Sequence, residues 1–225
     1  MNSDALGEAG ASLETIPAPP PAHENAAWAV AQIPLPPRQL FEFLAGIERL
    51  FRLNPYLEIA DWQSDAGANS HRLSVLNEMN GFRGAVSFHV EAIHENLHWG
   101  ANSGYRLVYD SGLKQSTELL IEAEDGGSRL TITERYQPVQ DEADERLKEV
   151  DRSLVPWAAA LRNHLRGMAR FSAVPGYRWW KERFMLGISP RQRRIVRLIV
   201  WISVLEFVVF LFVAAIFWLE TRVPS

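Results

Sequence analysis

A long apolar run near the C-terminus constrains this chain more than any other feature. From Leu198 to Leu219, one residue in 22, Glu206, has an ionisable side chain. At about 1.5 Å per residue, a helix of this length spans about 33 Å, close to the hydrocarbon thickness of a bilayer. A helix packed on a soluble domain normally has a polar stripe, whereas this run is apolar on every side. We therefore predict a transmembrane helix over residues 195–220 and a short tail over 221–225.

The charges on either side of the run predict its orientation. Seven Lys and Arg residues lie between positions 178 and 197, and one, Arg222, follows the run. The positive-inside rule then places the N-terminal side in the cytoplasm. We expect a single-pass, tail-anchored protein, with its N-terminal domain in the cytoplasm, in the bacterial inner membrane.

Glu206 stands out inside the apolar run. It lies about 12 Å from the start of the predicted helix, where a charge is expensive. Acids at such depth usually face protein or water, which makes Glu206 a candidate contact for a membrane protein partner. The alternative is a protonated or snorkelling carboxyl that the helix tolerates.

The segment before the run, residues 173–194, interleaves aromatic and basic side chains. This composition suits a short helix in the headgroup layer, where its cations meet anionic lipid. A plain stop-transfer flank needs only the charges, so both interpretations stay open. The candidate membrane-interface residues are Trp179, Trp180, Lys181, Arg183, Arg191, Arg193 and Arg194.

The rest of the chain is acidic. Residues 1–175 carry 15 Lys and Arg against 24 Asp and Glu, a net charge of −9, and residues 176–225 carry 8 against 3, a net charge of +5. An acidic body has no face that attracts phosphate backbones, so we expect no nucleic-acid partner. The absence of cysteine excludes disulfides and thiolate metal sites. Residues 1–25, rich in Ala, Pro and Glu, are expected to form a disordered arm.

Turn-forming sequences divide the middle of the chain into β-rich runs. Asn80-Gly81 is a type I′ hairpin signal, and short turns between successive runs make neighbouring strands antiparallel. The predicted strands cover residues 26–33, 57–64, 70–79, 82–93, 97–109, 113–123 and 128–137.

Two stretches have apolar residues at helical spacing. The first, 36–53, ends at Asn54-Pro55, because the residue before a proline disfavours helical geometry. The second, 141–172, supplies an apolar stripe that would cover the sheet. Pro156 falls inside it and predicts a kink, or a break into two helical pieces.

This order of elements, with "LPPRQLFEFLAGIERLFRLNPYLE" (35–58) and "LTITERYQPV" (130–139), resembles the START-like, helix-grip superfamily of polyketide cyclase/dehydrase and lipid-transport proteins. The resemblance covers about residues 26–172. It implies an α+β fold in which a curved antiparallel sheet of about seven strands wraps on a long C-terminal helix. It also implies a cavity between sheet and helix for an apolar small molecule or lipid.

Alternation along the strands places several polar and aromatic side chains on the inward face. Glu134 is the most informative, because a buried carboxylate must be paired or protonated. It would orient a ligand or act as a general acid or base, or else form a strand-end ion pair. The aromatic residues would line a cavity or fill a solid core. The candidate cavity residues are Trp62, Asn77, Phe82, Phe88, Trp99, Tyr105, Glu134, Tyr136, Trp157 and Leu161.

No catalytic, cofactor or metal motif is visible in the sequence. His94 and His98 are typical of a turn and a surface, and His164 of a surface or helix contact. The best hypothesis is a membrane-tethered binding module for an apolar molecule or lipid, such as a quinone or isoprenoid. The alternative is a non-catalytic accessory or assembly subunit of a membrane complex. A cyclase- or aromatase-type enzyme ranks last, because no polar catalytic cluster is recognisable.

Overall fold

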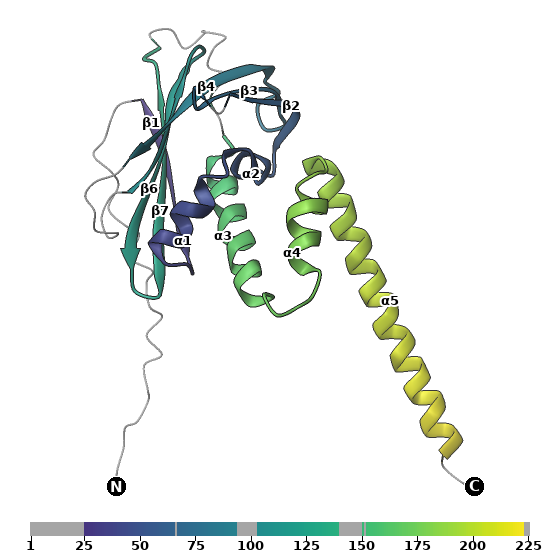
Figure 1. Ribbon diagram of the computed structural model, residues 1–225. Coiled ribbons are helices and arrows are strands. Elements are labelled where there is room, and N and C mark those ends of the chain that lie inside the picture. Colours follow the sequence, from purple (N-terminus) through teal and green to yellow (C-terminus); the bar gives the residue numbers. More distant parts are fainter. Residues whose placement is uncertain (1–24, 66, 94–102, 140–149, 151, 223–225) are drawn as a thin grey trace, which may run out of the picture.

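The computed structural model contains a curved sheet with a group of helices inside its curve (Figure 1). One long helix at the C-terminal end leaves this domain. The structure describes residues 25–65, 67–93, 103–139, 150 and 152–222. Several predicted features lie outside the described residues: residues 1–24 of the predicted arm, His94, His98, Trp99, and residues 141–149 and 151 of the predicted helix 141–172.

The sheet is an antiparallel meander of β2 to β7, and β1 pairs with the last strand, β7. Its order is β1-β7-β6-β5-β4-β3-β2, and every neighbouring pair is antiparallel. The strands are β1 (Ala26–Ile33), β2 (Leu57–Asp65), β3 (Ser70–Asn77), β4 (Arg83–Ile93), β5 (Ser103–Tyr109), β6 (Lys114–Glu124) and β7 (Gly127–Tyr136). This arrangement confirms the predicted α+β helix-grip fold.

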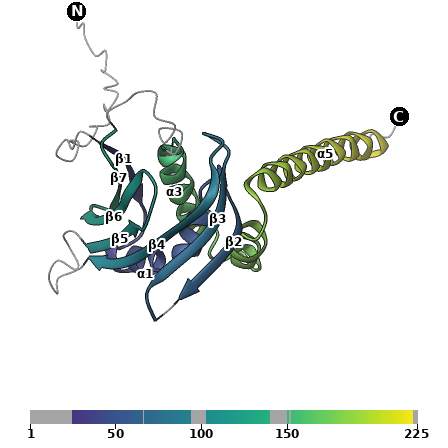
Figure 2. The same cartoon turned by 90° about the horizontal axis from the view of Figure 1, so that it is seen from above.

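Three helices pack on the concave face of the sheet. They are α1 (Pro37–Leu44), α2 (Ile47–Arg52) and α3 (Leu154–Arg170). The view from above shows α1 and α3 inside the curve (Figure 2). α3 packs mainly on β1, whose inward residues Ala29 and Ala31 are small enough to let the helix approach closely. The indole Nε1 of Trp157 donates to the Leu50 carbonyl at 2.9 Å, which fixes α3 against α2.

The structure bears on two local predictions. α3 begins at Leu154, so Pro156 lies in its first turn, where the missing N–H has no helical acceptor to lose and no kink is needed. The alternative, a break into two helical pieces, stays a prediction, because most of residues 141–151 lie outside the described part of the chain. The prediction for the β3–β4 connection was wrong. The β3–β4 connection is not a type I′ turn, because only Gly81 has positive φ, at 73°. It is a longer loop closed by Asn77, whose N–H donates to the Phe82 carbonyl at 2.8 Å. In this loop the side-chain oxygen of Asn80 accepts from the Phe82 N–H at 3.0 Å.

The inward and outward faces follow the predicted alternation. Phe88, Leu107 and Leu119 are fully buried on the inward face. On the outward face, Glu118 lies between Arg106 and Arg135, at 2.9 and 3.2 Å from their guanidinium nitrogens.

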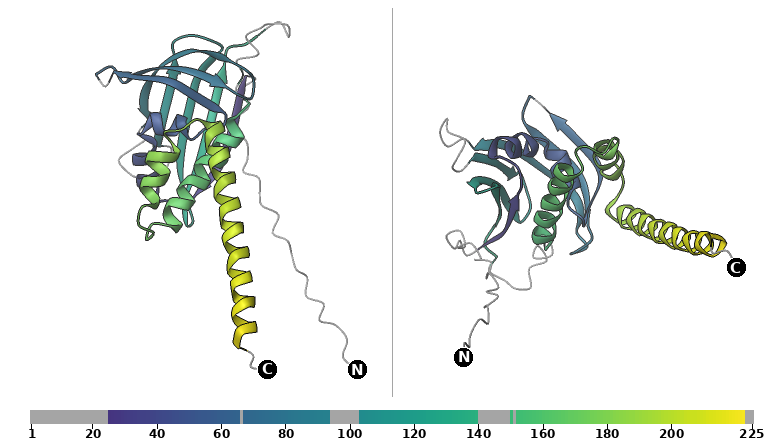
Figure 3. Two further views of the ribbon diagram at one scale, coloured as in Figure 1. Left: turned by 90° about the vertical axis from the view of Figure 1, so that its right-hand side faces the viewer. Right: turned by 90° about the horizontal axis from the view of Figure 1, so that it is seen from below.

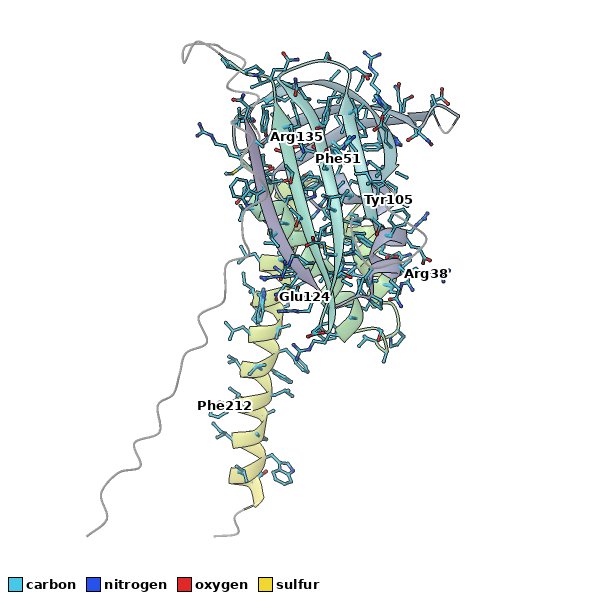
Figure 4. All side chains as sticks on the ribbon, turned by 90° about the vertical axis from the view of Figure 1, so that its left-hand side faces the viewer. Arg38, Phe51, Tyr105, Glu124, Arg135 and Phe212 are labelled. Carbon is cyan, nitrogen blue, oxygen red and sulfur yellow. The ribbon has the colours of Figure 1, made fainter. Side chains whose placement is uncertain are left out.

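The C-terminal region turns back along α3 before it leaves the domain. Two short helical segments, α4 (Tyr177–Trp179) and the π-helix η2 (Trp180–Met185), lead into α5 (Pro190–Arg222). In α5, residues Pro190–Leu219 form a helix long and apolar enough to cross a membrane, and its most apolar window is entirely exposed. That exposure argues against a core helix. The lower part of α5, including Phe212, extends beyond the other described elements (Figures 3 and 4).

Candidate functional site

A cavity of about 260 Å³ lies at the end of the concave face, where the β3–β4 and β5–β6 turns meet. Leu73, Val75 and Val86 form its sheet wall, and Phe51 of α2 closes it from the helical side. Its full lining is Phe51, Leu57, Leu73, Val75, Asn77, Asn80, Phe82, Ala85, Val86, Tyr109, Ser111, Gly112 and Lys114. We call this hollow the sheet cavity.

Aromatic stacking separates the sheet cavity from the solid core. The Phe51 ring stacks on Phe88 with centroids 5.2 Å apart, and its other contacts include Trp157 at 5.7 Å and Trp62 at 5.7 Å. Phe51 thus presents one side to the cavity and uses the others to complete the core. The same cluster continues to His71, whose ring lies 5.3 Å from that of Phe88, and burial lowers the pKa of His71.

A buried polar cluster lies at the β6 end of the cavity. Lys114, which lines the wall, places Nζ 2.5 Å from Oε1 of Glu134, and the Tyr136 hydroxyl donates to Oε2 of the same carboxylate at 2.5 Å. The ammonium also lies 5.7 Å from the centre of the Tyr109 ring. The cavity therefore has apolar walls and one cationic corner, whose charge Glu134 balances from behind.

The amides of the β3–β4 loop are held in place by the protein itself. Asn77 is 4% exposed, and its side-chain oxygen accepts from the Met79 N–H at 2.9 Å. The Asn80 amide donates to the Val150 carbonyl at 3.1 Å, which ties the loop to the segment before α3. Both side chains line the cavity as fixed groups.

The β3–β4 loop also contacts the long apolar helix. Glu78, between the two asparagines, accepts a hydrogen bond from Arg194 of α5 at 2.6 Å. Arg194 also donates to the Pro55 carbonyl at 3.2 Å, and Arg193 donates to the Arg52 carbonyl. The cavity rim is therefore joined to the first turns of α5.

The predicted cavity residues fall into three groups. Asn77 and Phe82 line the cavity, and Glu134 and Tyr136 stand behind Lys114. The others in the described part of the chain do not line it, because each is already packed elsewhere. Tyr105 stacks on Phe41 at 4.6 Å. Trp62, Phe88, Trp157 and Leu161 belong to the aromatic and aliphatic core or to its edge.

The predicted membrane-interface residues separate in the same way. Trp179, Arg183 and Arg191 are exposed. Lys181, Arg193 and Arg194 instead turn toward the domain and line a groove beside α3, and Trp180 packs near Tyr177 with ring centroids 6.4 Å apart. Glu206 is exposed on α5.

Lys114, Asn80 and Phe51 line the cavity but were not among the predicted residues. Lys114 was missed because a bulge between Lys114 and Ser116 reverses the alternation of β6 at its first residue. Without the bulge, Lys114 would share the outward face with Ser116 and Glu118. Phe51 was recognisable only as one apolar residue in a helical stripe. The described residues contain no group of three or more His, Asp and Glu side chains placed to hold a metal ion.

Comparison with known proteins yields similarity in structure alone. No family model matches the chain, and no curated protein matches it. Among solved structures, protein XoxI from Bacillus cereus is 14% identical, with a TM-score of 0.47 over 64% of this chain and 98% of that one. The aromatase/cyclase ZhuI from Streptomyces sp. R1128 is 14% identical, with a TM-score of 0.44 over 68% and 97%. Ara h 8.0201 is 20% identical, with a TM-score of 0.40 over 63% and 97%. At these values the similarity adds nothing about ligand or activity.

Proposed function

We propose that this protein is a membrane-tethered module that holds an apolar small molecule or lipid in the sheet cavity. The observation that carries the proposal is the contact between the rim of the sheet cavity and the apolar helix α5. The loop of Asn77 and Asn80 forms a wall of the cavity, and Glu78 in the same loop pairs with Arg194 of the apolar helix. A ligand dissolved in the bilayer would meet the cavity at high local concentration, because α5 keeps the two together.

The chemistry of the wall suggests the kind of ligand. Apolar side chains supply most of the contact surface, and small-molecule sites of this type use a few polar groups to fix orientation. Lys114 and Tyr109 are the polar groups at one corner. A volume of about 260 Å³ suits a small ligand or one end of a longer chain. An isoprenoid or quinone with a carbonyl or hydroxyl group directed at Lys114 fits these features.

A substitution that fills the sheet cavity with a larger side chain tests the proposal. Val86→Trp places an indole in the hollow, whereas Ser87→Trp adds the same side chain to the opposite face of β4. Lipid extraction and mass spectrometry of full-length protein in mild detergent should find one apolar molecule per chain in the wild type and in Ser87→Trp. Val86→Trp should lose it while it keeps the wild-type circular dichroism. A wild type that carries no apolar molecule, and binds none from a panel of quinones and isoprenoids, rejects the proposal.

The second candidate is an assembly subunit of a membrane complex. Glu206 favours it, because the side chain is exposed within an apolar helix, where acids usually contact protein or water. A membrane protein that co-purifies with the wild type and with Glu206→Asp, but is lost with Glu206→Leu, would support this role. A protein that purifies alone in every case argues against it. No observation favours catalysis, since Glu134, the best candidate acid or base, is engaged by Lys114 and Tyr136.

A further inference from the structure

A second hollow lies outside the sheet, between α3, η2 and the first turns of α5. Figure 1 shows the α4–η2 segment between α3 and α5. Its volume is about 410 Å³, and it shares no lining residue with the sheet cavity. It is lined by Leu53, Pro55, Pro156, Ala159, Ala160, Asn163, His164, Lys181, Met185, Leu186, Pro190, Arg193, Arg194 and Arg197. We call it the cationic groove.

The lining includes four cations and no carboxylate. Arg194 is balanced by Glu78, and the Arg193 guanidinium donates to backbone carbonyls, including that of Ile188 at 3.0 Å. Neither Lys181 nor Arg197 pairs with a carboxylate in the described part of the chain. The groove therefore gathers four cations, of which Lys181 and Arg197 lack a carboxylate partner in the described part of the chain.

Burial, and after it repulsion from neighbouring arginines, disfavours the charged forms of two of these cations. Arg193 is 7% exposed, and burial, with contributions from Arg197 and Arg52, lowers its pKa to about 10. Burial and then Arg197 lower the pKa of Lys181. An anion in the groove would offset both effects, because it supplies the opposite charge at short range.

His164 supplies an independent observation that points to a ligand. Its ring lines the groove and is 8% exposed, yet its Nε2 is buried and has no hydrogen-bond partner among the described residues. A buried polar atom left unpaired is unfavourable, so such atoms usually have a partner. Asn163, exposed beside it, brings a side-chain amide to the same wall.

The groove also lies where headgroups would be. Arg197 ends its wall, and the apolar run begins at the next residue, Leu198. With α5 across a bilayer, lipid phosphates would lie level with these side chains. We propose that the cationic groove binds the phosphate group of an anionic membrane lipid. The site needs α5 in the membrane but does not depend on any ligand of the sheet cavity.

Native mass spectrometry of the full chain in mild detergent tests the site. The probes are phosphatidylglycerol, phosphatidylcholine and inorganic phosphate. The wild type should retain one phosphatidylglycerol in preference to phosphatidylcholine. The double variant Lys181→Gln/Arg197→Gln should bind phosphatidylglycerol about thirtyfold more weakly, because each cation near anionic lipid contributes about 1 kcal/mol.

Two further variants separate the groove from general surface charge. Arg183→Gln/Arg191→Gln removes the same charge from exposed positions of η2 and α5 that do not line the groove, and should bind as the wild type does. Asn163→Asp keeps the shape and all four cations, adds a negative charge to the wall and should weaken binding. Circular dichroism checks that each variant is folded.

The ring ¹⁵N resonances of His164, assigned with His164→Gln, give a local readout. They should shift when phosphatidylglycerol is added. A similar shift with inorganic phosphate, and its competition with lipid, would mean that the phosphate group alone is recognised. A shift with lipid only would mean that the acyl chains along α5 contribute. Equal losses in the groove and control double variants, no preference over phosphatidylcholine, or bound lipid that leaves His164 unmoved would overturn the proposal.

Discussion

The sheet cavity and the cationic groove both adjoin the first turns of α5, but they treat their buried polar groups in opposite ways. Behind the cavity wall, Glu134 is fully buried and engaged by Lys114 and Tyr136. In the groove, the equally hidden Nε2 of His164 has no hydrogen-bond partner among the described residues, and the wall contains four cations and no carboxylate. In the sheet cavity, other residues of the protein pair with the buried carboxylate, and the wall is mainly apolar. The cationic groove leaves its polar groups open to the charged ligand that we propose.

This difference has a thermodynamic consequence. A buried ion pair stabilises a fold little compared with apolar packing, but the removal of one partner strands a charge in a medium that solvates it poorly. The cationic groove should behave in the opposite way at Lys181 and Arg197, which lack a carboxylate partner in the described part of the chain, because the removal of one of them relieves repulsion. Substitutions on the two sides should therefore have opposite effects on stability.

The largest effect is expected at the cavity corner. Lys114→Met removes the cation that lies against Glu134 and should lower the free energy of unfolding by about 3 kcal/mol, since it leaves a buried carboxylate to be protonated or rehydrated. Chemical denaturation of the full chain in mild detergent measures the change. Lys181→Met is the matched substitution in the groove and should leave the stability of lipid-free protein unchanged or slightly increased.

A double variant tests whether the pair itself is responsible. Lys114→Met/Glu134→Leu replaces both charges by apolar groups and should recover most of the loss. If the double variant is as unstable as the sum of both single variants, the pair is not what stabilises this corner.

The pH dependence of stability should reveal the lowered pKa of His164. Its folded pKa is lowered to about 4 from an ordinary value of 6.5, first by burial and then by Lys181 and Arg49. Between pH 4 and 6.5, His164 is protonated in the unfolded chain but neutral in the folded chain. Stability should therefore be complete above pH 6.5 and fall as the pH decreases toward 4, by roughly 2–3 kcal/mol. Denaturation of lipid-free protein at a series of pH values measures the slope.

His164→Gln isolates this contribution from the carboxylates that titrate in the same range. The variant should have a shallower slope between pH 6.5 and 4 than the wild type. Equal slopes of stability against pH in the two proteins would show that His164 accepts a proton as readily in the folded state as in the unfolded chain. His164 would then not be a buried group without a partner, and the proposed difference between the two hollows would fail.

The general fold was predictable because its signals are local. Alternation along β7 assigns Glu134 to the inward face, and the apolar residues that begin at Leu198 identify α5 by their composition alone. The Lys114–Glu134 contact was not predictable, since a single bulged residue decides which face Lys114 occupies. The groove was hidden for a different reason. It forms only when α5 returns to α3, and neither helix has a sequence pattern that specifies the contact. The sequence therefore predicted Lys181, Arg193 and Arg194 as membrane-interface residues but gave no sign that they line one groove.

The smallest expected effect is at the link between the two hollows. Arg194 and Glu78 lie 2.6 Å apart, but their side chains are 48% and 24% exposed, so the pair contributes at most about 1 kcal/mol. Its role should be geometric, because it ties the cavity loop to the helix that forms the groove wall. Arg194→Gln should barely change stability, but it should widen the range of angles between the sheet and α5.

The lack of cysteine makes that angle measurable. Spin labels at Ser74→Cys on the outer face of β3 and Ile199→Cys on α5 occupy exposed positions on the two bodies. Pulsed electron spin resonance in nanodiscs should give a narrow distance distribution in the wild type and in Arg191→Gln, and a broader one in Arg194→Gln. An unchanged distribution would assign the fixed angle to the buried Arg193, which holds the Arg52 carbonyl, and the two hollows would then stay together without their exposed ion pair.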